Sequence, residues 1–169
     1  MFRFKKEYHT TIYIVGLMLL TASLTLSQGM MSIAGFILFF NWLAEGKFRA
    51  KYDTLRKSKG ALAFLLIYAI HIIGLFYTHN FIFALDDLRI KLPLLALPVI
   101  FVTTPAVSRK VLITILLVYV ASTFVASLIG IGIYFTNRIT DIRDISIFIS
   151  HIRFSLNICL AIFILVFLF

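Results

Sequence analysis

The amino-acid sequence predicts an all-α, polytopic integral membrane helical bundle with about six transmembrane helices. Hydrophobic residues make up 62% of the 169 residues, including 18 Phe, whereas soluble domains use roughly 45–50%. The mean hydropathy is +1.04. The apolar residues form long blocks between short charged segments, and a block of about 20 such residues crosses a bilayer core of about 30 Å. Several membrane-spanning helices account for this pattern.

The apolar blocks give six predicted spans, at residues 10–26, 30–44, 61–77, 92–104, 111–135 and 151–169. The first two form a helical hairpin that breaks at residues 27–29, with Gly29 in the turn. At about 1.5 Å per residue each half is slightly short for a bilayer, so one strongly tilted helix over residues 10–42 is the alternative. In the fourth span we expect Pro93 in the first turn and a kink at Pro98. The fifth is long enough to tilt.

The distribution of basic residues predicts that the N-terminus is cytoplasmic. No repeat, low-complexity tract or soluble domain interrupts the spans, so we expect residues 1–169 to form a single transmembrane domain. With the N-terminus inside, eleven Lys and Arg residues lie on the cytoplasmic side and five on the outer side, as the positive-inside rule favours. The inner set is Arg3, Lys5, Lys6, Lys47, Arg49, Lys51, Arg56, Lys57, Lys59, Arg109 and Lys110, and the outer set is Arg89, Lys91, Arg138, Arg143 and Arg153. The net charge of +9 is therefore a topology signal. Residues 43–60 are predicted to form a cytoplasmic loop that contacts membrane lipids and no nucleic acid.

The outer charges are where function is expected, because ionisable groups near the bilayer are costly unless they are used. Residues 81–92 predict an amphipathic helix on the outer interface, with Asp87 placed to pair with Lys91 and Asp86 with Arg89. The helix is then either a self-neutralised surface element or the carrier of one free cation that binds an anionic group. The charges of the next outer loop cancel, and this balance suits a solvated connection. The charged residues of this loop are Arg138, Asp141, Arg143 and Asp144.

Arg153 heads the last apolar block and is the strongest candidate for an anion-binding residue. On a helix, Ser150, Arg153 and Asn157 follow the i, i+3, i+7 spacing of one polar stripe, which should face a bundle interior or a water-filled cavity. Arginine keeps its charge and its donors match phosphate oxygens. The alternative is that Arg153 snorkels to the interface. His151, four residues before Ser155, is either a proton carrier or an amphipathic interface residue.

The remaining residues indicate neither a metal site nor a bound cofactor. No phosphate-cradling glycine loop, Ser-His-Asp arrangement or metal-ligand spacing is evident in the sequence. The single cysteine, Cys159, lies in an apolar run and is expected to be a buried, inert thiol.

Several segments resemble the N-terminal part of the O-antigen ligase and polymerase family of bacterial envelope glycosyltransferases. They are FFNWLAEGKFRAKYDTLRKSKG, GLFYTHNFIFALDDLRIKLPLLALPVIF and SHIRFSLNICLAIFIL. The resemblance implies a GT-C-like fold in the bacterial inner membrane. It also implies metal-independent transfer of a glycan from an undecaprenyl-pyrophosphate carrier to a lipid A core or to a growing glycan at the periplasmic face. Family arginines hold the pyrophosphate, and the first corresponds to Arg153. Arg89 and Lys91 correspond more loosely.

Family members are longer, and their large periplasmic loop, a later arginine and the catalytic histidine have no counterpart in these 169 residues. We therefore expect a fragment that is inactive alone and supplies half of the carrier-lipid site. The competing interpretation is a small non-catalytic multi-pass membrane scaffold or a transporter subunit, in which Arg153 snorkels or pairs helices. A transporter usually shows interrupted spans in two matching repeats, and LPLLALP has no such counterpart.

Overall fold

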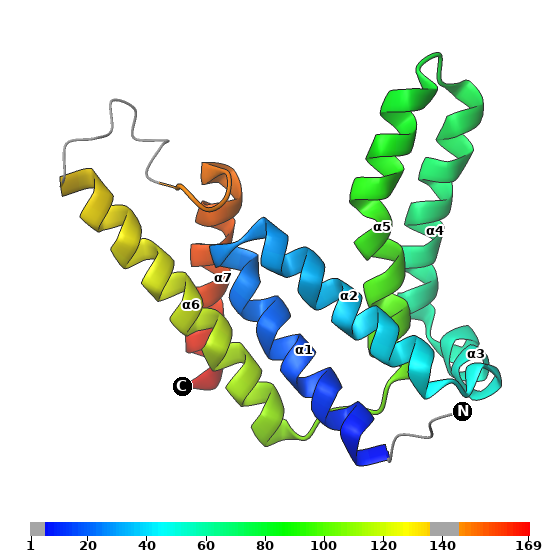
Figure 1. The fold of residues 1–169 in the computed structure, drawn as a ribbon, viewed down its shortest axis with the longest axis horizontal. Helices are drawn as coiled ribbons and strands as arrows, with labels where there is room; N and C mark the ends of the chain where they lie inside the picture. The colour runs from blue at the N-terminus through cyan, green and yellow to red at the C-terminus, as the bar shows by residue number, and fades with distance from the viewer. Residues whose placement is uncertain (1–5, 136–145) are drawn as a thin grey trace. The chain divides into compact units, whose positions relative to one another are not determined.

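The computed structural model describes residues 6–135 and 146–169, and this part of the chain is helical without strands (Figure 1). The elements are α1 (Lys6–Leu26), α2 (Gln28–Glu45), α3 (Phe48–Lys57), α4 (Lys59–Gly74), a 3₁₀ turn (Leu75–Tyr77), α5 (Phe81–Thr103), α6 (Arg109–Phe135) and α7 (His151–Leu168). The prediction of an all-α chain is thus confirmed for the described residues.

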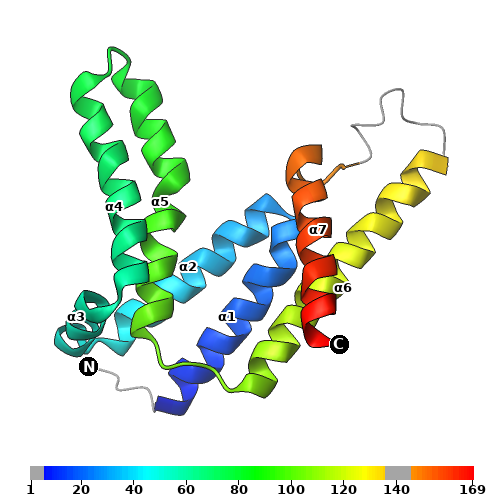
Figure 2. The ribbon, with the colours of Figure 1, turned by 180° about the vertical axis from the view of Figure 1, so that it is seen from behind.

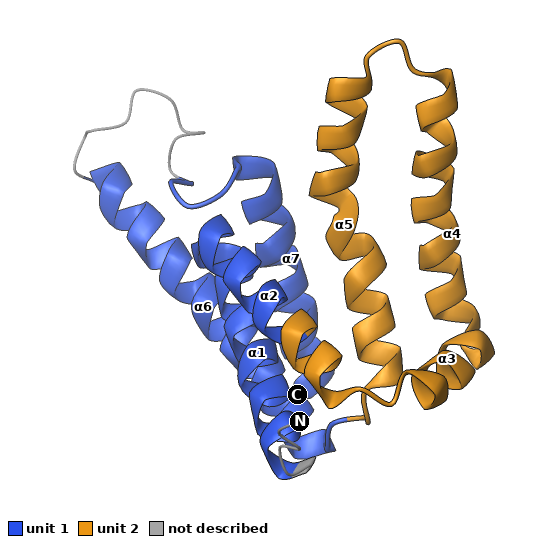
Figure 3. Ribbon diagram, turned by 45° about the vertical axis from the view of Figure 1, so that its right-hand side comes forward, with its two compact units in different colours: residues 1–38, 107–169 blue, residues 39–106 orange. Residues whose placement is uncertain are grey.

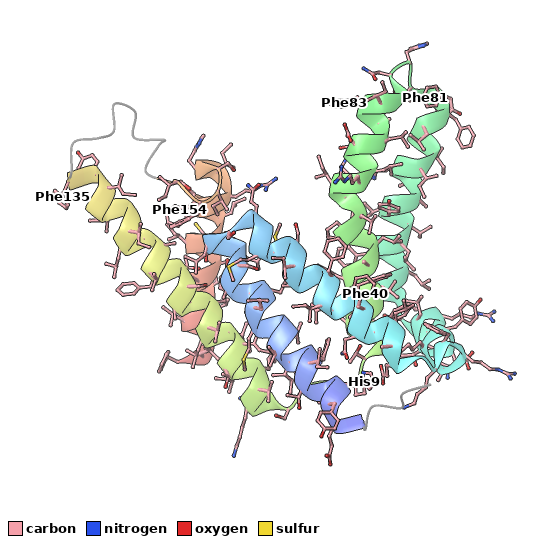
Figure 4. All side chains as sticks on the ribbon, viewed as in Figure 1. His9, Phe40, Phe81, Phe83, Phe135 and Phe154 are labelled. Carbon is pink, nitrogen blue, oxygen red and sulfur yellow. The ribbon has the colours of Figure 1, made fainter. Side chains whose placement is uncertain are left out.

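Four of these helices are long and apolar enough to cross a membrane, and a fifth span is present if α2 and α3 are counted as one broken helix. The four are α1, α4 with its 3₁₀ turn, α6 and α7. Large apolar side chains cover their outer faces (Figure 4); Phe163 of α7, for example, is 71% exposed. Such surfaces suit lipid rather than water, which is consistent with a membrane location. The count of six spans stays a prediction, because α5 carries four charged residues in its first half.

The chain forms two compact units, one of residues 1–38 and 107–169 and one of residues 39–106 (Figure 3). In the first unit α6 packs along α1 and also against α7 (Figures 1 and 2). The buried face of α6 places Ser122, Ala126 and Gly130 four residues apart. Small residues at this spacing let helix backbones approach closely. The first unit is therefore a bundle held at a seam of small side chains.

The predicted break in the first apolar block falls at Ser27 alone. The Ser27 hydroxyl accepts a hydrogen bond from the Met30 N–H at 3.3 Å, so Ser27 caps the start of α2. Gly29, expected in the turn, lies inside α2 instead, because no residue at the break needs a left-handed backbone. A Cβ built on Gly16 of α1 would lie 2.8 Å from a methyl group of Leu38 of α2, so the Leu38 side chain fills the space beside Gly16.

The second unit is an antiparallel hairpin of α4 and α5, and α3 packs against both helices (Figure 3). The Asn80 side chain accepts a hydrogen bond from the Phe83 N–H at 3.1 Å and caps α5. Figure 4 shows Phe81 and Phe83 at this end of the hairpin. The interfacial helix and the fourth span predicted from the sequence are one continuous helix. Pro93 therefore lies in its interior, not in a first turn, because the cap at Asn80 comes several turns earlier.

Residues 43–60, predicted to be a loop, contain α3, and α3 is bent by 115° from α2. Gly46 and Lys47 make this corner with left-handed φ values of 67° and 56°. Lys51 of α3, which the prediction placed in a cytoplasmic loop, is buried. Its Nζ donates to the Trp42 carbonyl at 2.7 Å and lies 3.0 Å from a carboxylate oxygen of Glu45. The Trp42 carbonyl needs this donor because the Gly46 N–H bonds to the Leu43 carbonyl instead.

Candidate anion-binding pocket

A pocket of about 280 Å³ lies in the first unit, where α1 ends and where α2 and α7 begin. Its lining combines four apolar side chains with four polar ones: Leu24, Met31, Ile149 and Leu156, and Ser23, Gln28, Arg153 and Asn157. Two segments that are far apart in the sequence, residues 23–31 and 149–157, thus meet at one end of the unit. The mixture suits a ligand with an apolar part and a polar or anionic head.

Among the described residues, Arg153 supplies the only cation of this lining. It lies in the first turn of α7, which follows Ser150 at its N-cap, where the Phe154 N–H bonds to the Ser150 carbonyl at 3.0 Å. Arg153 is exposed and forms no ion pair with any residue in the described part of the chain. The free N–H groups at the helix start carry a partial positive charge. The guanidinium therefore adds to a positive environment at the pocket and keeps its donors available.

Asn157, one turn after Arg153, lines the same pocket but has its side chain engaged by neighbouring helices. Its Oδ1 accepts a hydrogen bond from the Tyr119 hydroxyl of α6 at 3.0 Å, and its Nδ2 donates to the Leu24 carbonyl of α1 at 3.3 Å. These bonds join α7 to both α1 and α6. The prediction that Arg153 and Asn157 share a face agrees with the structure, but Asn157 acts there as a clamp between helices.

Tyr119 and two further polar residues extend this clamp into the core, and none of the three was predicted as part of a site. The Thr25 hydroxyl donates to Ser122 at 3.2 Å, and the Ser122 hydroxyl donates to the Tyr119 carbonyl at 2.8 Å. All three side chains are nearly inaccessible. A signal for the α6 residues was present in the sequence, because Tyr119, Ser122 and Ala126 follow one another at three- and four-residue spacing on one helix face.

The other candidate residues lie outside this pocket lining. His151 is exposed at the start of α7, and its carbonyl accepts a hydrogen bond from the Ser155 hydroxyl at 2.9 Å. Lys91 pairs with Asp87 at 2.6 Å, as predicted. No ion pair joins Asp86 and Arg89 in the described structure, so Arg89 is the exposed, unpaired cation of that segment. Arg89 and Lys91 belong to the second unit and Arg153 to the first.

Cys159 and the second outer loop complete the set of predicted residues. Cys159 is exposed on α7, so the expectation of a buried thiol is wrong; only 6% of this helix is buried within the chain. Arg138, Asp141, Arg143 and Asp144 lie outside the described residues. Among residues 6–135 and 146–169, no three His, Cys, Asp or Glu side chains gather as metal ligands would.

Comparison with known proteins leaves the pocket as the principal guide to function. No protein-family model, curated protein or solved structure matches this chain.

Proposed function

We propose that the chain is part of an O-antigen ligase/polymerase-like membrane glycosyltransferase and that its pocket holds the pyrophosphate of an undecaprenyl-pyrophosphate-linked glycan. The observation that supports the proposal most directly is the position of Arg153, an exposed guanidinium without an ion pair among the described residues, in a pocket otherwise lined by apolar and neutral polar side chains. The resemblance of the SHIRFSLNICLAIFIL segment to that family points to the same residue.

The chemistry of such a transfer fits a fixed cation. When the bond between glycan and carrier breaks, negative charge accumulates on the pyrophosphate oxygens of the leaving group. A guanidinium held in a partly dry site stabilises that charge without reorganisation. Arg153 would take this role, Leu24, Met31 and Leu156 would contact the first isoprene units, and Asn157 would hold α7 in place. The acceptor, a lipid A core or a growing glycan, would be activated by residues outside this pocket.

The proposed setting is the inner membrane of a bacterium, with the N-terminus in the cytoplasm and the pocket at the periplasmic face. If α1 to α7 alternate across the membrane with α3 on the surface, the connection between α1 and α2 and the start of α7 reach the same face. The basic segment 47–59 then falls on the cytoplasmic side, as the positive-inside rule requires. The GT-C-like architecture and six spans belong to this proposal.

A binding measurement on the chain in lipid nanodiscs tests the carrier-lipid part of the proposal. Undecaprenyl pyrophosphate should bind the unmodified chain more tightly than undecaprenyl phosphate. Arg153→Ala should weaken binding by about ten- to hundredfold, the equivalent of one charge-assisted hydrogen bond, and Arg153→Lys should retain part of it. Arg109→Ala, which removes a cation outside the pocket lining, is the matched control. Equal affinity of the Arg153→Ala and unmodified chains would refute the site.

The glycan-transfer part needs a cellular measurement. Arg153→Ala introduced into the natural gene should reduce surface glycan on a gel at unchanged membrane protein level. Full glycan with this variant would instead favour the non-catalytic scaffold or transporter subunit, in which Arg153 snorkels and the Asn157 clamp only joins helices.

A further inference from the structure

We propose that α3 is an interfacial helix whose basic face binds the headgroups of anionic phospholipids. The residues involved all belong to the second unit, so the lipid site does not depend on the proposed pyrophosphate pocket. The charge of this segment alone predicts a loop that contacts lipid in general. As a helix, the segment instead has an aromatic face and a basic face, and it is held in place by its contacts with α4 and α5.

The connections of α3 place it at the end of a membrane-length helix. One residue, Ser58, separates α3 from α4, and α4 with its 3₁₀ turn is long and apolar enough to cross a membrane. The helix packs against both α4 and α5. The chain turns by 115° between α2 and α3, so α3 does not extend α2 along its axis. Its position suits a helix that lies along the membrane surface.

The faces of α3 differ in chemistry as such a location requires. Phe48, Tyr52 and Leu55 share one face at three- and four-residue spacing. Phe48 and Tyr52 remain 49% and 62% exposed, so their rings are only partly covered by the chain and can enter the headgroup region. Arg49 and Arg56 flank Tyr52 at i−3 and i+4, which sets two guanidinium groups beside the aromatic edge of the helix. Guanidinium groups at this boundary match phosphate oxygens of lipid headgroups.

The charge of this segment is strongly positive after its internal pairing is considered. Lys51 is taken up by Glu45 and the Trp42 carbonyl. The other cations of this segment form no ion pair with any described residue: Lys47, Arg49, Arg56, Lys57 and Lys59. The segment 46–60 holds one acidic residue, Asp53. Five free cations against one carboxylate complement an anionic membrane surface.

The buried lysine also fixes how α3 presents this basic face. Lys51 Nζ lies 4.6 Å from the ring centroid of Trp42 and 5.9 Å from that of Phe48, and the two rings meet edge-on at 5.5 Å. The Trp42 Nε1 donates to Thr103 of α5 at 2.7 Å. These contacts hold the corner between α2 and α3. They also put the one tryptophan of the chain next to the proposed lipid site, where its fluorescence reports on nearby lipid.

The test measures which phospholipid surrounds Trp42. The chain is reconstituted in phosphatidylcholine vesicles with a small, fixed fraction of phosphatidylglycerol, and the acyl chains of one lipid or the other carry bromine, which quenches tryptophan. We expect brominated phosphatidylglycerol to quench far more than its mole fraction predicts, and high salt to reduce this excess. One basic side chain near an anionic surface strengthens binding by about fivefold. Arg49→Gln with Arg56→Gln should therefore lower the preference by about tenfold or more.

The matched control is Arg109→Gln with Lys110→Gln, which removes the same charge from the start of α6 and should keep the preference. Circular dichroism checks that each variant retains its helices. The proposal is overturned if the unmodified chain shows no preference for phosphatidylglycerol, if the α3 variant keeps it, or if the control loses it equally, since the effect would then follow net charge. A preference that persists in high salt would also overturn it.

Discussion

The substitution Lys51→Met should destabilise the chain by about 2–3 kcal/mol, because it removes the ammonium from a nearly closed polar site. The Lys51 side chain is 5% exposed and that of Glu45 is 17% exposed. Loss of the ammonium leaves the Trp42 carbonyl without its donor, which costs about 1–3 kcal/mol. It also leaves the Glu45 carboxylate unpaired, and breaking a buried ion pair costs about 3–5 kcal/mol. Both costs are upper limits, because Glu45 keeps some access to solvent and because the substitution also removes the cost of burying the Lys51 ammonium. The net loss of stability is therefore about 2–3 kcal/mol.

Unfolding in mixed micelles of mild detergent and dodecyl sulfate, followed by helical circular dichroism, measures this effect. Trp42 emission gives a second, local signal, since the ring lies 4.6 Å from the lysine nitrogen. Adding Glu45→Gln to Lys51→Met should recover about 1–2 kcal/mol, because the unpaired charge is then gone. Lys57→Met, on the exposed face of α3, should change stability by less than about 0.5 kcal/mol. If Lys51→Met matched Lys57→Met, the structural role given to Lys51 would be wrong.

Three further substitutions or modifications test the first unit. Gly16→Ala should lower stability by about 1–3 kcal/mol in the same assay because its Cβ would lie 2.8 Å from a buried leucine, whereas Gly35→Ala, with open space around it, should be neutral or stabilising. Asn157→Ala should cost about 1–2 kcal/mol by breaking its two side-chain bonds to neighbouring helices. The Tyr119 hydroxyl would keep the carbonyl of residue 157 as an acceptor at 3.3 Å, so adding Tyr119→Phe should cost about 0.5–1.5 kcal/mol more. Cys159 is exposed on α7, so if α7 spans the membrane its thiol should lie in lipid, where it stays protonated and a charged maleimide should not label it; labelling in membranes as fast as in the unfolded chain would show that Cys159 faces water.

The long apolar helices could be located well from the sequence, because hydrophobic runs of this length have few alternatives. The prediction of 111–135 differs from α6 by two residues, and that of 151–169 differs from α7 by one. Prediction failed where charge obscured a local signal. Strong positive charge led residues 43–60 to be assigned as a loop, although Phe48, Tyr52 and Leu55 already had helical spacing.

The pocket could be predicted only in part. The stripe of Arg153 and Asn157 follows from local helix geometry, and both residues do line the pocket. Ser23, Gln28 and Met31 come from a much earlier part of the chain, and no local pattern shows which helices meet at that point. The contacts of Asn157 could not be predicted for the same reason, since its partners on α1 and α6 are distant in sequence.

The two prolines inside α5 give this helix a mechanical property that its neighbours lack. Proline has no N–H, so Pro93 and Pro98 leave the carbonyls of Arg89 and Leu94 without their helical donors. Among the helices of the described residues, only α5 has proline in its interior, and bending is cheapest where the hydrogen-bond ladder is already open. The helix can therefore bend at the two prolines, which lie between its charged first half and the apolar residues at its end. A displacement of the segment around Arg89 would therefore bend α5 at Pro93 and Pro98, and would leave Thr103 and its hydrogen bond to Trp42 in place.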